Sequence, residues 1–481
     1  MGCHISECEH ATAIAQPRRL RPLALVVAAI SACAGLQSAT PAFATLSDGI
    51  AELQALNPAL NGSGVSVGQV EANIDTNTNG PDQFEVNPAA SGVNQPQRVF
   101  SYIDGSGNVT TAFSSAGYSG HATTVAQYFY GTAGAARGVA NVDNYDAGYF
   151  QNQVIDNAVS NGSGGYSLPA TLHSDSVINQ SFINTFPTTA SASYIATQVQ
   201  YINAIYDAYT NTYGTIFVSA IGNGQTVKTS PTSEINPPAT AYNSIAVGAY
   251  NLSTGTVVSS GPTYDGRSKP DLVAPGSETS YATPIVSGIA AVMVQAGNLA
   301  TGYAAQDGFT QNQYSQAATD ERTVKALLLN GAEKPAGWTH TSTQPLDTRY
   351  GAGLVNAYNA YELLAAGRQS YSQANNITTP ATSSVEHQLV GWDFNSVNTA
   401  SQGKSVNHYV FSLAPGHAYD LTSTLVWDAQ TEFTSATKNQ TPPPTYSPNY
   451  NEGLNNLFLK LYNANTGALV DSSVSTVDNV Q

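Results

Sequence analysis

The chain has 481 residues, of which 41% are hydrophobic and only 10% are charged, so it is long enough for two or three domains with a sizeable core. Acidic residues outnumber basic ones by 32 to 16, which gives a net charge of −16. Because a phosphate backbone attracts basic patches, this balance argues against nucleic acid as a partner. The excess negative charge is what keeps many exported proteins soluble.

Residues 1–44 have the features of a signal peptide. A region with three arginines precedes the apolar run "LALVVAAISACAGL", and the small residues "AFA" end at Ala44. The apolar run is too short to cross a hydrocarbon core of about 30 Å, and polar sequence follows it. We therefore predict a secreted or cell-surface protein. The alternative is a lipid anchor, because "ISAC" ending at Cys33 resembles a lipoprotein cleavage site.

The three cysteines, Cys3, Cys8 and Cys33, all lie within this segment. A mature protein that begins after Ala44 would contain no cysteine. The sequence thus predicts no disulfide, no cysteine–zinc site and no cysteine nucleophile in the mature protein.

Residues 45–366 alternate apolar strand-like runs with helix-like stretches. The runs "GVSVGQVE", "SVINQSF", "TIFVSAIG" and "SIAVGAY" predict strands, whereas "HATTVAQYFYG", "ATPIVSGIAAVMVQAG" and "TVKALLLNGA" predict helices. This alternation favours an α/β domain with a parallel sheet covered by helices on both faces. Such sheets place their sites in loops beyond the carboxyl ends of the strands.

After residue 366 the pattern changes. A polar linker is expected over 367–385, and the segment 386–481 has mainly two-residue periodicity, which predicts an all-β domain of the β-sandwich or jelly-roll kind. The chain stops at "VDNVQ" without a closing turn, so we expect this domain to be truncated. We also expect this C-terminal domain to contact a surface or a glycan.

Four polar residues occur where the predicted elements begin or end. Ser280 lies where a loop becomes a helix, and the backbone N–H groups of a first helical turn favour a developing oxyanion. His121 lies at a second such junction, Glu71 ends a predicted strand, and Asn223 follows another. Each alone is typical of a cap, a surface residue or a turn. Their joint appearance in this order favours a serine nucleophile with its base, acid and oxyanion donor.

The motifs around these residues resemble the subtilisin-like serine peptidase family, over residues 60–366. That family runs acid, His, Ser along the chain, with the landmarks "DTG", "HGTHVAG", "AAGN" and "GTSMATPHVAG". The corresponding segments here are "VEAN", "HATTVAQ", "AIGN" and "ETSYATPIVSG", and "KPDLVAPG" and "YGAGLVNAYNAYELL" add to the likeness. The resemblance implies a three-layer α/β fold and hydrolysis of protein or peptide substrates.

The resemblance also implies the role of each residue. Ser280 would attack the scissile carbonyl, His121 would transfer the proton, Glu71 would orient His121, and Asn223 with the Ser280 N–H would hold the oxyanion. Substrate-binding roles are expected for three residues, which lie in the segments that line the cleft in that family: Ser181, Phe182 and Gly222. Extended peptide would pair there as an added strand.

Two positions depart from the family pattern. Glu71 stands in place of aspartate, and a misplacement of ~1 Å can cost ~10²-fold in rate. Asp75 is no simple substitute, because four residues of extended chain move it by up to ~13 Å. Glu278 replaces a glycine two residues before the nucleophile. Sedolisins, which use Glu for His and Asp for the oxyanion Asn, are a poorer match, since His121 and Asn223 are both present.

No cofactor is required for this chemistry. The segment "DTNTNGPD", from Asp75 to Asp82, resembles the start of a calcium loop but lacks the acid that completes an EF-hand, so structural calcium is the minor alternative to a polar turn.

The sequence leaves two functions in competition. The first is an active serine endopeptidase with a Glu-His-Ser variant of the triad. The second, motivated by Glu71 and Glu278, is a catalytically impaired binding protein of the same fold.

Overall fold

The structure is a computed structural model that describes most of the chain. The described residues are 2–7, 23–31, 46–73, 84–114, 118–156, 159–160, 166–167, 175–299, 310–369, 371–374, 388–396, 406–431 and 454–481.

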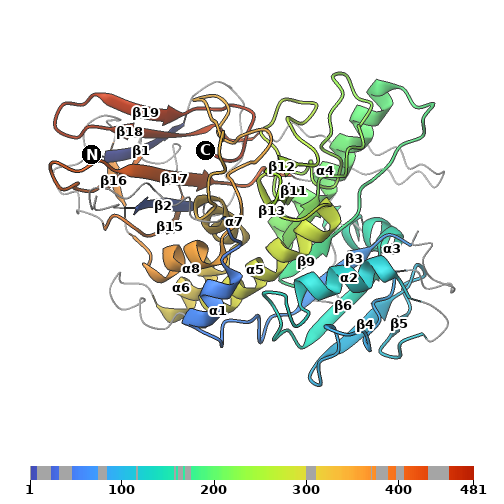
Figure 1. The fold of residues 1–481 in the computed structure, drawn as a ribbon. Coiled ribbons are helices and arrows are strands. Elements are labelled where there is room, and N and C mark those ends of the chain that lie inside the picture. The colour runs from blue at the N-terminus through green and yellow to red at the C-terminus, as the bar shows by residue number, and fades with distance from the viewer. Residues whose placement is uncertain are drawn as a thin grey trace.

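The larger part of the molecule is built around a nine-stranded, mostly parallel sheet (Figure 1). Its order is β12-β11-β10-β9-β3-β6-β4-β5, with β13 also paired to β11; only β5 and β12 run antiparallel to their neighbours. The strands are β3 (Val67–Glu71), β4 (Val99–Ile103), β5 (Val109–Thr110), β6 (Asn141–Asp146), β9 (Val177–Gln180), β10 (Ile216–Ala220), β11 (Ile245–Asn251), β12 (Thr256–Val257) and β13 (Leu272–Pro275). A separate hairpin joins β7 (Val159–Ser160) to β8 (Tyr166–Ser167).

Helices cover both faces of this sheet, and the alternation of side chains along the strands shows which residues meet which helix. On one face Val67, Val177 and Val218 belong to the core cluster that includes helices α2 (Gly120–Phe129) and α5 (Thr279–Leu299). On the other face Val70, Ile178 and Phe217 pack with residues of α4 (Ala192–Tyr213). The predicted α/β fold with helices on both sides is therefore confirmed.

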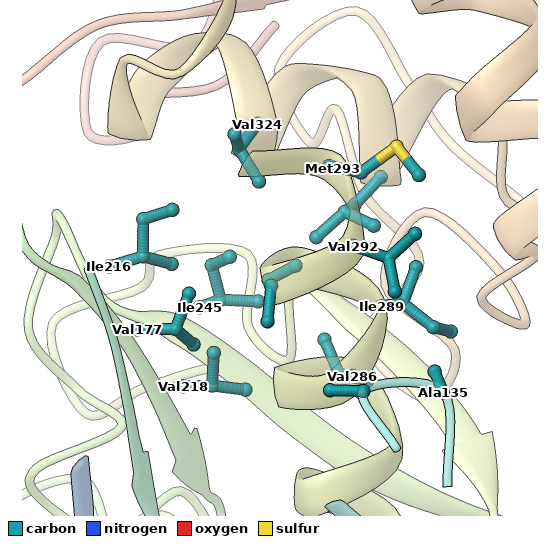
Figure 2. Packing of buried hydrophobic residues seen from close by; sticks show 14 of the residues in the cluster. Ala135, Val177, Ile216, Val218, Ile245, Val286, Ile289, Val292, Met293 and Val324 are labelled. Carbon is teal, nitrogen blue, oxygen red and sulfur yellow. The ribbon is translucent and has the colours of Figure 1, made fainter. Parts of the chain in front are cut away.

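Helix α5 forms the centre of the core. Figure 2 shows Val177, Val218 and Ile245 of the strands directed toward Val286 and Ile289 of this helix. The helix is long and apolar enough to cross a membrane by composition alone, but 89% of its most apolar window is buried inside the fold. Its apolar surface is thus accounted for by packing.

The remaining helices are short and lie around this core. They are α1 (Ile50–Leu56), α3 (Ala147–Tyr149) with the adjoining π-helical turn η1 (Phe150–Ile155), α6 (Gln311–Ala318), α7 (Glu321–Asn330) and α8 (Ala357–Ala365). Helices α5, α6, α7 and α8 pack on one another, and α1 packs on α8.

The C-terminal strands form two small antiparallel sheets apart from the large one (Figure 1). One has the order β14-β16-β1-β18-β19 and the other β15-β2-β17, so the N-terminal strands β1 and β2 each lie between C-terminal strands. Their bounds are β1 (Gly2–Glu7), β2 (Leu23–Ser31), β14 (Ser372–Ala374), β15 (Asp393–Asn395), β16 (Val406–Val410), β17 (Asp420–Val426), β18 (Leu457–Tyr462) and β19 (Leu469–Ser473). The predicted all-β character holds for these residues, while the jelly-roll arrangement stays a prediction.

The main hydrophobic core extends into the C-terminal region. Trp392, Val426 and Val480 are buried in the same cluster as α5 and α8. The indole N–H of Trp392 donates to the carbonyl of Leu364 at 3.1 Å, and its ring lies 5.3 Å from that of Tyr314. The two regions therefore share one apolar interior.

Candidate active site

Glu71 and His121 form a hydrogen-bonded pair at the carboxyl edge of the large sheet. The Nδ1 atom of His121 lies 2.8 Å from Oε2 of Glu71. The Glu71 side chain is only 1% exposed, whereas that of His121 is 30% exposed. A buried carboxylate at Nδ1 favours the tautomer with the proton on that nitrogen, which leaves Nε2 as the atom able to accept a proton.

Local structure brings these two side chains together. Glu71 is the last residue of β3 and points to the face covered by α2, as Val67 does. His121 is the second residue of α2, whose start is fixed by the Ser119 hydroxyl accepting from the N–H of Ala122 at 2.9 Å. The strand end and the helix start thus meet at one point.

A row of buried amide side chains lies directly below this pair. Gln69 is paired in register with Asn144 on β6 and with Asn179 on β9, and all three are fully buried. The Nδ2 of Asn144 donates to the carbonyls of Gln69 and Phe84. Each amide is satisfied by neighbouring groups, so the layer that supports the site is polar without being charged.

Ser280 is the second residue of α5, and Pro284 determines how its backbone is bonded. In a regular helix the carbonyl of Ser280 would accept from the N–H of residue 284, but proline has no N–H. The Ser181 hydroxyl takes that place and donates to the Ser280 carbonyl at 2.8 Å. The Ser280 hydroxyl in turn donates to the Ser181 carbonyl at 3.3 Å.

Ser181 is itself held by the amide row. Asn179 donates from Nδ2 to the Ser181 hydroxyl at 3.0 Å, and its Oδ1 accepts from Ser287 of α5 at 2.9 Å. The strand β9 and helix α5 are therefore tied together at Ser280 and again at Ser287.

Asn223 is oriented by the residue that precedes Ser280. Its Oδ1 accepts from both the backbone N–H and the hydroxyl of Thr279, at 2.8 and 2.9 Å. Because the N–H can only donate, the atom facing Thr279 must be the oxygen, and the amide Nδ2 is directed elsewhere. Within the described parts of the chain, no group accepts a hydrogen bond from this Nδ2 or from the Ser280 N–H. Two donors are thus available beside the candidate nucleophile.

Gly222 is required by the backbone before Asn223. Its φ is 113°, and a Cβ there would lie 2.6 Å from Nδ2 of Asn236. That Nδ2 donates to the carbonyls of Ile221, Gln225 and Glu234 and closes the loop. The backbone conformation alone therefore explains why residue 222 is a glycine. Its contact with substrate stays a prediction.

The remaining residues predicted from the sequence are Phe182, Glu278 and those of the calcium loop. Phe182 is half-buried and packs with the cluster below α4, and Glu278 is exposed two residues before Ser280. The predicted calcium loop from Asp75 to Asp82 lies outside the described residues.

Three residues of the site were not expected from the sequence. Gln69 donates to Glu71, Thr279 orients Asn223, and the ring of Tyr281 lies 5.9 Å from that of His121. Gln69 had a usable signal, because it is a polar residue in an apolar strand and shares a face with Glu71 two positions later. Tyr281 and Thr279 are neighbours of Ser280 in the chain and gave no separate signal.

Part of the chain is similar to known proteins. Two curated relatives are a serine protease/ABC transporter B family protein, tagB, from Dictyostelium discoideum, at 25% identity over 47% of the chain, and pyrolysin from Pyrococcus furiosus, at 30% identity over 33% of the chain. The aligned part spans only 13% of the length of either relative. Residues 62–353 match the subtilase family. This match covers more than half of the chain, and the chain therefore belongs to the subtilase family, as the motifs predict.

Proposed function

We propose that this protein is a secreted serine endopeptidase that cleaves protein or peptide substrates through an acyl-enzyme. Membership of the subtilase family supports serine endopeptidase activity. The finer part of the proposal is that Glu71, His121 and Ser280 act as the triad. The observation that carries it is the buried carboxylate of Glu71 at 2.8 Å from Nδ1 of His121.

The proposed reaction proceeds in two halves. In the first, Nε2 of His121 takes the hydroxyl proton of Ser280 while Oγ attacks the scissile carbonyl, and Glu71 stabilises the imidazolium that forms. The oxyanion accepts from Nδ2 of Asn223 and from the Ser280 N–H. His121 then gives the proton to the leaving amine. In the second half a water molecule, activated by the same histidine, releases the acid and restores Ser280.

To take part, the Ser280 hydroxyl has to leave its present acceptor, the Ser181 carbonyl. It donates to the Ser181 carbonyl at 3.3 Å, a distance at the long end for an O–H donor. Catalytic hydrogen bonds are often long before substrate binds, so this arrangement is compatible with the role of a nucleophile.

Labelling with a fluorophosphonate probe tests the proposal directly. Covalent labelling at Ser280 is expected, and Ser280→Ala and His121→Ala should abolish it. Ser193→Ala, at an exposed serine of α4, is the control and should label like the parent. A folded parent protein that does not label would contradict the proposed activity and favour a binding protein of the same fold.

The role of Glu71 has its own test. Glu71→Gln keeps the side-chain length but removes the charge and the preference for the correct tautomer, so we expect kcat to fall by about 10⁴-fold, as for an amide in place of the triad acid elsewhere. Unchanged activity would show that Glu71 is not the third triad member.

Secretion is proposed on the signal-like segment 1–44, whose cleavage would remove strands β1 and β2 from the two C-terminal sheets. Expression with this segment in a secreting host should release a product whose intact mass corresponds to a start at residue 45. A product that keeps residues 1–44, or one that carries a lipid on Cys33, would contradict cleavage after Ala44.

A further inference from the structure

Gln69 is a fully buried side chain that bonds both to Glu71 and to the residue that follows His121. Its Nε2 donates to Oε1 of Glu71 at 2.8 Å and to the carbonyl of Ala122 at 2.9 Å. Ala122 follows His121 in α2. One amide therefore fixes the carboxylate to the first turn of the helix that carries the histidine.

The orientation of this amide is determined by its surroundings. The carbonyl of Ala122 can only accept, so the atom facing it must be nitrogen. The oxygen, Oε1, accepts from the hydroxyl of Tyr130 at 2.5 Å. Burial raises the pKa of Tyr130 well above its usual value, so the phenol keeps its proton and remains a donor. Both amide hydrogens and the amide oxygen are thus engaged.

The two oxygens of Glu71 consequently have different partners. Oε2 is bonded to His121 and Oε1 to Gln69. Glutamate has one more rotatable bond than aspartate, and a carboxylate held at only one oxygen can swing about that bond. The bond from Gln69 removes this freedom and sets the plane of the carboxylate.

We propose that Gln69, held by Tyr130, is a positioning residue that allows a glutamate to serve as the acid of this triad. The proposal rests on the proposed peptidase function. Gln69 touches neither substrate nor the reacting atoms, and it acts through Glu71.

The test is a double-mutant cycle on peptide hydrolysis. Gln69→Met keeps the length of the side chain and removes its polar atoms. We expect kcat to fall by about 10²-fold, the effect of a misplacement of ~1 Å, with KM changed by less than threefold. In the Glu71→Gln background the same substitution should change kcat by less than twofold, since the group through which Gln69 acts is gone.

Two tyrosines provide a test variant and its matched control. Tyr130→Phe removes the hydroxyl that holds Gln69 and should lower kcat by about tenfold. Tyr102→Phe also removes a buried hydroxyl, one that donates to the carbonyl of Val86 at 3.0 Å and contacts neither Gln69 nor Glu71. Its kcat should equal that of the parent. Circular dichroism and melting temperature of all variants identify losses due to misfolding.

The outcomes separate this proposal from the proposed function. A parent that labels at Ser280 and a folded Gln69→Met variant with parental kcat would overturn the positioning role alone. Equal losses of kcat in both backgrounds would also overturn it, because the effect would not pass through Glu71. A parent that neither labels nor cleaves contradicts the peptidase itself, whatever the variants do.

Discussion

Asn223 shows how little side-chain freedom remains at the residues of the site. Its oxygen is bonded twice to Thr279, and its backbone N–H donates to the side chain of Gln225 at 2.5 Å. The amide is therefore preorganised before substrate arrives. Preorganised donors stabilise developing charge without having to reorient during the reaction.

The Asn223→Ala variant should consequently lose transition-state binding and little else. We expect kcat to fall by ~10²–10³-fold with KM nearly unchanged. Steady-state kinetics on a peptide substrate measures both quantities. A rise in KM with kcat preserved would indicate that Asn223 binds the ground state and is not an oxyanion donor.

The candidate catalytic residues can be recognised in the sequence, whereas the residues that support them cannot. Ser280, His121 and Asn223 stand in recognisable motifs, and each lies where a helix begins or a strand ends. Gln69 and Asn179 are interior strand residues, and their roles depend on which strands are neighbours. No local sequence pattern predicts the order β9-β3-β6, in which β3 lies between strands from later in the chain.

At the scale of elements, α7 is fixed to the large sheet by a buried ionic group. Asp271, next to β13, lies 2.6 Å from Nζ of Lys269 and 3.2 Å from Nζ of Lys325 on α7. Burial opposes ionisation of Asp271, but the two ammonium groups outweigh it and hold its pKa below the usual range. The motif "KPDLVAPG" therefore has a structural role in joining helix to sheet.

Asp271→Asn should destabilise the protein strongly, because it removes the counter-charge of two buried lysines; burial already lowers the pKa of Lys269 to about 7, so this lysine would be forced to give up its proton. Breaking such a group typically costs 3–5 kcal/mol, so the free energy of unfolding should fall by about 4 kcal/mol. Denaturant unfolding measures it. Glu52→Gln removes one negative charge at an exposed position of α1 and should stay within about 0.5 kcal/mol of the parent. Similar effects of the two substitutions would contradict the role of Asp271.

Helix α4 is the longest helix in the described part of the structure, yet its sequence carries no clear helical pattern. It spans 22 residues and carries five tyrosines with many Asn, Thr and Gln residues, so its apolar stripe is indistinct. The buried side includes Asn203, Asp207 and Asn211, whose partners come from other parts of the fold. This helix is held by hydrogen bonds to distant residues and not only by an apolar face. The sequence of the helix alone does not reveal such bonds.

Asp207 of α4 makes stability depend on pH. Burial raises its pKa to about 6, against the opposing effects of the Asn243 N–H and the Arg267 guanidinium. The folded state then binds more protons than the unfolded state between about pH 4 and pH 6, so this contribution to stability is complete at low pH and is lost as pH rises through 6. It amounts to about 3 kcal/mol.

The Asp207→Asn variant should lack this contribution. Its oxygen can still accept from the N–H groups of Tyr242 and Asn243, while the titrating proton is gone. We expect the free energy of unfolding of the variant, relative to that of the parent, to rise by about 3 kcal/mol between pH 4 and pH 6, as measured by urea unfolding of both proteins at several pH values. Identical pH dependence in the two proteins would contradict the raised pKa.

At the scale of the whole molecule, the boundary expected near residue 366 does not divide the interior. Besides Trp392, hydrogen bonds cross between the two regions: Asp478 accepts from the N–H of Ser268 at 2.6 Å, and Asn243 exchanges two bonds with Ala429. From these contacts we predict that the C-terminal region unfolds together with the peptidase region.

Trp392→Ala is expected to lower the stability of the peptidase region along with that of the C-terminal strands. Emptying the space of a buried tryptophan costs about 3–5 kcal/mol. Calorimetry should show one transition, moved to lower temperature, with peptidase activity lost over the same range. Trp427→Ala is the comparison variant, because it removes a buried tryptophan from the separate small cluster of the C-terminal strands. Two separate transitions in the parent would contradict a shared unit.

The row of amides beneath the site, Asn144, Gln69 and Asn179, has a consequence for how the enzyme responds to acid. Carboxamides neither gain nor lose protons over the range in which proteins remain folded, so these supports are the same at every working pH. If His121 is the base, as proposed, its protonation in mild acid would remove activity while these amides are unchanged. Activity lost on such acidification should return in full, without a refolding delay, once neutrality is restored.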